Sequence, residues 1–110
     1  MGRMQDNPIF FEAIARHLCI EAIYNRSTVR LEPHILYTRN DALYLDAITA
    51  ERDRLLPRER KLGTFRLSGL NDVSLTPHQF QPDPLFDPDD AKYADVTLFK
   101  IETKASNPAD

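Results

Sequence analysis

The segment LEPHILYTRNDALYL at residues 31–45, together with TFRL at residues 64–67, decides the fold. Each piece sets aromatic or charged side chains among aliphatic ones with a period of two, which is the pattern of a half-buried β-strand. The polar stretch Arg39-Asn40-Asp41 predicts a hairpin turn between the first two strands. Pro33 has no N–H to donate to a ladder, so it predicts a bend, a bulge or an edge position.

A helix is expected on the N-terminal side of these strands. Asn7-Pro8 offers an N-cap followed by proline at the first helical position, so the helix should run from Pro8 to about His17. From Leu18 the pattern changes to alternation, which predicts a first strand ending near Tyr24. The apolar residues that recur at helical spacing are Phe10, Phe11, Ile14 and Leu18.

A helix followed by short strands with short connections predicts a mainly β fold. We expect a small antiparallel barrel of five strands, because closure buries one face of every strand and removes the exposed edges. The strands are expected near residues 18–24, 29–37, 43–48, 64–67 and 70–75. The strand phases place Leu31, Leu43, Leu45, Phe65 and Leu67 in the core.

The whole chain, residues 1–110, is expected to form one domain, since 110 residues suffice for a single core. Its core is expected at about residues 8–76. Residues 77–102 form a proline-rich, acidic extension in which Val96 and Leu98 suggest one more short strand. Residues 103–110 are small and polar, which predicts a disordered tail.

Charge is unevenly distributed along the chain. The net charge is −3, which argues against a general nucleic-acid coat. Residues 16–66 nevertheless carry ten Lys/Arg against seven Asp/Glu, whereas residues 67–110 carry three against eight. The basic residues of the middle region are nearly all arginine, which suits bidentate contacts with phosphate, although a GC-rich genome would also favour arginine codons.

The chemical motifs of enzymes are absent from the sequence. There is no phosphate-binding glycine loop, and His17, His34 and His78 lack the spacing of metal ligands, so no metal, cofactor or catalytic set is expected. The single cysteine, Cys19, fits a reducing compartment. No apolar run suggests a membrane span or an export signal, so a cytoplasmic location is expected.

Residues from about Ala13 to Phe86 resemble the WYL domain, a bacterial module named for a Trp-Tyr-Leu tripeptide. The matching pieces are a strand ending in Tyr24, the Arg-x-x-Pro-His-x-Leu-Tyr pattern that begins at Arg30, the sequence LYL at 43–45, and TFRL at 64–67. Leu43 stands where the family has tryptophan, and Gly69 stands where an arginine usually follows.

The resemblance implies an Sm-like, SH3-type barrel with a regulatory role. Family members usually follow a DNA-binding helix-turn-helix in transcription regulators and are thought to sense ligands, chiefly nucleic acid or nucleotide-like effectors. Only one convincing helix precedes the strands here, so a DNA-binding part is expected on another chain. Carried onto this chain, the candidate ligand-binding residues are Arg30, His34, Tyr44 and Arg66, with Tyr37 and Arg39 at the next tier.

The sequence therefore leaves two alternative functions from different classes. One is a ligand-sensing module that binds an oligonucleotide or a nucleotide-like anion. The other is a protein-interaction or oligomerisation module that binds another copy or a separate regulatory subunit. The candidate residues also have purely structural readings: Tyr44 as packing, His34 as a partner of a turn carbonyl, and Arg30 and Arg66 as cross-strand partners of Glu32 or Asp46.

Overall fold

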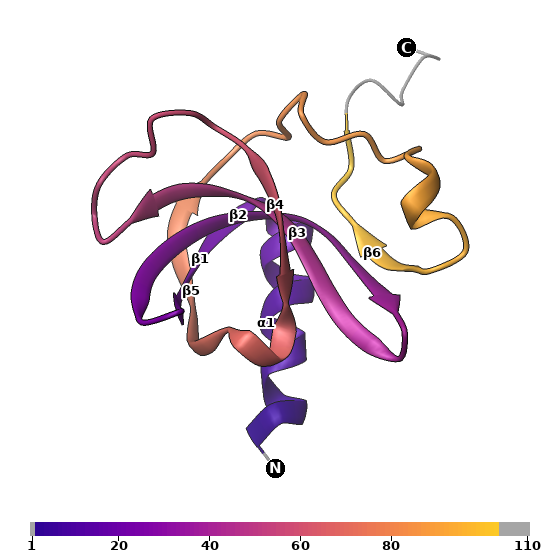
Figure 1. The fold of residues 1–110 in the computed structure, drawn as a ribbon, viewed down its shortest axis with the longest axis horizontal. Helices are drawn as coiled ribbons and strands as arrows, with labels where there is room; N and C mark the ends of the chain where they lie inside the picture. Colours follow the sequence, from indigo (N-terminus) through magenta and orange to yellow (C-terminus); the bar gives the residue numbers. More distant parts are fainter. Residues whose placement is uncertain (1, 104–110) are drawn as a thin grey trace.

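The structure, a computed structural model, describes residues 2–103 of the chain, with side chains described from Pro8 onward. It is a mainly β fold with one N-terminal helix (Figure 1). The elements in chain order are α1 (Gly2–Arg16), β1 (Leu18–Tyr24), β2 (Ser27–Arg39), β3 (Ala42–Arg52), β4 (Leu62–Arg66), the 3₁₀ helix η1 (Leu67–Gly69), β5 (Asn71–Gln79), the 3₁₀ helix η2 (Ala91–Tyr93) and β6 (Thr97–Lys100).

The N-terminal helix is longer than the sequence predicted. It begins at Gly2, so Pro8 lies inside α1 and does not start it. One stripe of the helix, formed by Phe10, Ala13 and Ile14, is buried in the core. Through this stripe α1 packs against β1, β2, β5 and β6. As the only α-helix in the described residues, it is too short and too polar to cross a membrane.

Two-residue turns connect the first three strands. Asn25 and Arg26 join β1 to β2, and Asn40 and Asp41 join β2 to β3. All four residues have φ between 50° and 68°, as a type I′ turn requires. The twist of a type I′ turn matches the right-handed twist of the flanking strands, so the two strands of each hairpin pair without a shift in register at the turn. The hairpin predicted at Arg39-Asn40-Asp41 is therefore present.

The strands form one antiparallel sheet that does not close into a barrel. The order is β4-β3-β2-β1-β5, with β6 added to the end of β2 beyond β1. The expected closed barrel of five strands is thus corrected to an open sheet of six. Although η1 brings β5 directly after β4, no ladder joins these two strands in the described part of the chain. Side chains fill the gap instead: the Tyr24 ring packs edge-on against Phe65 with 5.1 Å between centroids.

A bulge in β2 reverses which side chains face the core. The pairing of β2 with β3 shifts between Pro33 and Ile35, so His34 is an extra residue. Pro33 was predicted to mark such an irregularity. Before the bulge Leu31 faces inward, and after it Leu36 does, because the phase has changed. Tyr37 therefore lies on the opposite side of the sheet from Leu31, whereas an uninterrupted period of two would place both side chains on the same side.

The two faces of the sheet have different neighbours. The inner face carries Leu31, Leu45 and Phe65, all buried as predicted, while Leu43 and Leu67 are only partly buried. The outer face carries the alternate side chains of β2, β3 and β4, which point away from Leu31, Leu45 and Phe65. Residues 80–101 fold back across this outer face, above and to the right of the sheet in Figure 1. The extension contributes four buried side chains to the core: Phe80, Phe86, Tyr93 and Ile101.

The first hairpin offers a test of this fold. Arg26 has φ of 68°, a conformation that costs a residue with a Cβ roughly 1 kcal/mol and costs glycine almost nothing. Arg26→Gly should therefore raise the free energy of unfolding in urea by up to about 1 kcal/mol. Thr28→Gly, on the adjacent strand, should lower it by a similar amount. If both substitutions destabilise equally, the turn geometry described here is wrong.

Candidate functional site

Four of the six candidate residues lie together on the outer face. Tyr37 and Tyr44 are direct partners across β2 and β3, with 5.9 Å between their ring centroids. Arg66 is the direct partner of Tyr44 across β3 and β4. The guanidinium carbon of Arg39 lies 4.8 Å from the centre of the Tyr44 ring. We call Arg39, Tyr44 and Arg66 the Arg-Tyr-Arg strip.

The two arginines of the strip are exposed and have no acidic partner. Neither Arg39 nor Arg66 makes a salt bridge in the part of the chain that the structure describes. Tyr44 between them is half-buried. Stacking on this ring restrains the Arg39 guanidinium while its N–H donors remain available. The arrangement can therefore accept an anion beside an aromatic ring.

Arg30 lies far from this strip. It pairs with Glu51 at 3.3 Å and with Glu21 at 3.9 Å, one on each neighbouring strand. Glu51 and Tyr44 are seven residues apart on β3, so Arg30 and Tyr44 are separated by about 20 Å. The structural reading of Arg30 as a cross-strand ion-pair partner thus holds, with Glu21 and Glu51 in place of Glu32 or Asp46.

His34 is the extra residue of the β2 bulge and is fully buried. Its Nδ1 lies 2.8 Å from the Glu32 carbonyl oxygen, and its Nε2 accepts the Asp83 N–H at 3.0 Å. The ring packs against Phe80 and Phe86, each 5.3 Å away between centroids. Both ring nitrogens are occupied in the neutral Nδ1–H form, so no polar atom of His34 is left to meet a ligand.

The strongest polar centre of the outer face is Asp46. It was not predicted from the sequence as a ligand-binding residue. Its fully buried carboxylate accepts hydrogen bonds from Tyr37 and Thr64, both at 2.8 Å, and from Tyr93. The Lys92 ammonium lies 3.0 Å from Oδ2. Burial, followed by the bond to Asp46, raises the pKa of Tyr37 to about 12, and the same causes raise the pKa of Tyr93. Both hydroxyls therefore stay protonated donors at neutral pH.

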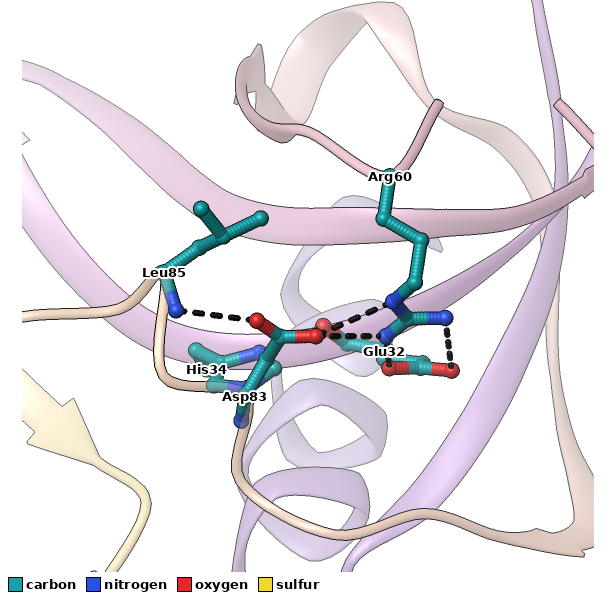
Figure 2. Close-up of polar contacts among 5 residues, drawn as sticks. All are labelled: Glu32, His34, Arg60, Asp83 and Leu85. Atoms are coloured by element: carbon teal, nitrogen blue, oxygen red, sulfur yellow. Dashed lines mark hydrogen bonds and ion pairs between the residues drawn. The ribbon is translucent and has the colours of Figure 1, made fainter. Parts of the chain in front are cut away.

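A second polar network fixes the start of the extension. Arg60, in the loop between β3 and β4, lies between Glu32 and Asp83 (Figure 2). Its Nη2 is 2.6 Å from Glu32 Oε1 and 2.9 Å from Asp83 Oδ2. Asp83 also accepts the Leu85 N–H at 2.9 Å. Arg60 thus ties β2 to a segment far away in the sequence.

The pKa shifts in this network agree with the geometry. The hydrogen bond to Glu32 raises the pKa of Arg60 despite its partial burial. Burial works against ionisation of Asp83, but the Leu85 N–H and Arg60 outweigh it and hold the pKa of this carboxyl below its usual value. Burial lowers the pKa of His34, even though its bond to the Glu32 carbonyl works in the other direction.

The described residues hold no cluster of His, Cys, Asp or Glu with the arrangement of a metal site. Cys19 is buried, and burial raises the pKa of its thiol to about 11. The thiol is therefore protonated at neutral pH and a poor nucleophile. The described residues therefore offer neither a metal site nor a reactive thiol on the outer face.

The functional residues that the sequence did not reveal belong to contacts between distant segments. Asp46 was visible as an acidic residue in an otherwise apolar strand, which is the usual sign of a buried polar group with partners. Its partner Tyr93 lies 47 residues away in the short 3₁₀ helix η2, where no local pattern marks it. The same holds for Arg60 and Glu32, which are 28 residues apart.

Comparisons of the chain with protein-family models, with curated proteins and with solved structures find no match.

Removal of the Asp46 charge should loosen the extension. Asp46→Asn keeps the size of the side chain but leaves Lys92 without its buried partner and one amide hydrogen facing hydroxyl donors. We expect the free energy of unfolding to fall by about 3 kcal/mol. Trypsin should also cut after Lys92 sooner than in the wild type. Asp72→Asn, at an exposed position, serves as the control and should change neither quantity.

His34 should make stability depend on pH. Its pKa is lowered in the folded protein, so below about pH 6.5 the unfolded chain binds a proton that the folded chain resists. The free energy of unfolding should therefore fall as the pH drops from 7 to 5, by at most about 1.4 kcal/mol per pH unit from this one group. Urea titrations of His34→Gln should show a smaller slope, and those of the exposed His78→Gln an unchanged one. Equal slopes in all three proteins would remove His34 as the cause.

Proposed function

We propose that this chain is a regulatory binding module that holds a phosphate-bearing, planar ligand on the Arg-Tyr-Arg strip. The observation that carries the proposal is the presence of two exposed arginines on either side of the half-buried Tyr44, neither of which pairs with a carboxylate among the described residues. Arginine forks suit phosphate oxygens, and an aromatic or guanidinium plane suits a base. A nucleotide or a single-stranded oligonucleotide combines both features.

Among Arg30, Arg39, Arg60 and Arg66, the distribution of charge favours Arg39 and Arg66 as the place for an anionic ligand. The remaining arginine of the sequence pattern, Arg30, already has two glutamates around it. Arg60 is likewise held by Glu32 and Asp83. An incoming phosphate at either position would compete with carboxylates, whereas at Arg39 and Arg66 it would meet no such competition.

The regulatory part of the proposal rests on the resemblance to WYL domains. The open six-stranded sheet is not the closed SH3-type barrel that the resemblance implies, so the resemblance rests on the sequence pieces alone. Within that family the expected role is ligand sensing in bacterial transcriptional regulation. The protein would act in the cytoplasm.

One observation favours the second candidate, a protein-interaction module. The loop between β3 and β4 exposes Leu55 to 71% and Leu56 to 79%. They border a hollow of about 530 Å³ that also includes Pro57 and Phe65. Neighbouring large apolar side chains at such exposure are typical of contact surfaces. This loop would bind another protein without any use of the Arg-Tyr-Arg strip.

A binding titration separates the two functions. Fluorescein-labelled oligothymidylate, followed by fluorescence anisotropy at low salt, should bind the wild type and weaken steeply as salt rises. Arg66→Ala should weaken binding about tenfold through the loss of one charge-assisted contact. Tyr44→Ala should weaken it by a similar factor, because it removes the ring on which Arg39 rests and on which a base can stack.

The matched control is Arg58→Ala, which removes an exposed arginine from the loop between β3 and β4. It changes the net charge as Arg66→Ala does, and it should leave oligothymidylate affinity within about twofold if the strip is the site. If Arg58→Ala and Arg66→Ala weaken oligothymidylate affinity equally, the effect is one of net charge and not of a contact in the strip. Absence of binding at low salt, together with self-association that Leu56→Ser abolishes, would favour the interaction module.

A further inference from the structure

Strand β6 has an open edge on the side away from β2. Its only strand partner in residues 2–103 is β2, through the pairs Ile35–Lys100, Leu36–Phe99 and Tyr37–Thr97. No backbone hydrogen bond joins residues 81–90 to residues 97–100. Within the described residues, the outer N–H and C=O groups of β6 therefore have no backbone partner, and an unpaired edge of this kind is a template for another strand.

This edge lines a groove between β6 and the proline-rich segment before it. The groove has a volume of about 970 Å³, and every residue from Thr97 to Thr103 borders it. The facing wall contains Pro82, Pro84, Pro88 and the ring of Phe86. Prolines have no N–H to donate, so this wall cannot itself complete the β6 ladder. Leu98 is 49% exposed at the edge. We call this hollow the β6 groove.

The charge of the β6 groove selects the chemistry of an occupant. Four carboxylates line it, from Asp83, Asp87, Asp89 and Glu102, against the single ammonium of Lys100. Asp83 is paired with Arg60, but the other three make no salt bridge in the described part of the chain. An extended segment with basic side chains would find complementary charge on both sides of its backbone.

We propose that the β6 groove binds an extended, basic peptide segment of another protein by strand addition to β6. Backbone hydrogen bonds to the free edge would supply sequence-independent affinity, Leu98 would meet an apolar side chain of the peptide, and Asp87, Asp89 and Glu102 would meet lysine or arginine. A second copy paired through the same edge is disfavoured, because it would place these carboxylates against their own counterparts. This surface is separate from the Arg-Tyr-Arg strip and opposite to it in charge.

The test uses the full chain and a short synthetic peptide of alternating lysine and valine, about eight residues long. Calorimetry at low salt should show binding, and a peptide of alternating glutamate and valine should not bind. Amide hydrogen exchange should reveal new protection at residues 97–100, which simple charge attraction would not produce. The lysine-valine peptide with N-methylated backbone amides should bind much more weakly, because it cannot complete the ladder.

The charge contribution is measured with paired double variants. Asp89→Asn with Glu102→Gln should weaken the peptide about tenfold. Asp41→Asn with Asp72→Asn removes the same charge from a turn and from the start of β5, at two positions of positive φ where asparagine is well tolerated, and should have little effect. Equal losses in the two double variants, binding of the glutamate-valine peptide, or absence of protection at residues 97–100 would each overturn the proposal. Protection of residues 97–100 that increases with protein concentration in the absence of peptide would show pairing between copies instead.

Discussion

The buried carboxylate of Asp46 is the constraint on which the arrangement of the molecule depends. A charge at this depth is tolerated only when it is paired and fully hydrogen-bonded. Tyr37 and Thr64 supply bonds from within the sheet, but Tyr93 and Lys92 come from the extension. The sheet alone would leave the carboxylate under-satisfied. The extension is therefore a required part of the fold and not an appendage to a finished domain.

This constraint divides the outer face into two regions. Where the extension crosses the sheet, it buries His34 and Tyr37 and ties them into bonds that leave no atom for a ligand. Beyond it, at the ends of β2 and β4, Arg39 and Arg66 remain exposed. The candidate site is consequently smaller than the set of residues that the sequence pattern suggested. Its two arginines form no salt bridge with any carboxylate among the described residues.

Local patterns predicted the elements well and the faces of β2 less well. Alternation from Leu43 to Ile48 predicted the face of each side chain in this part of β3 correctly, because nothing interrupts its period before Thr49, although Leu43 is only partly buried. In β2 the pattern marked Pro33 as irregular but could not say that His34 is the extra residue, and one extra residue reverses every later position. The predicted closure into a barrel did not occur, because no ladder joins β4 to β5 in the described part of the chain. Instead, the side chains of Tyr24 and Phe65 fill the gap.

The extension that satisfies Asp46 also creates the free edge of β6. Hydrogen bonds from Thr38 N–H to Val96 and from Ile101 N–H to His34 hold the two ends of β6 on β2, at 3.1 Å and 2.8 Å. Among the described strands only β2 lies beside β6, and the segment that faces its other edge is rich in proline. An unpaired edge normally invites aggregation, and a short strand lined by like charges limits that risk between copies. The same charges leave the edge accessible to a strand of opposite sign, so protection against self-association and selectivity for a basic partner follow from one set of side chains.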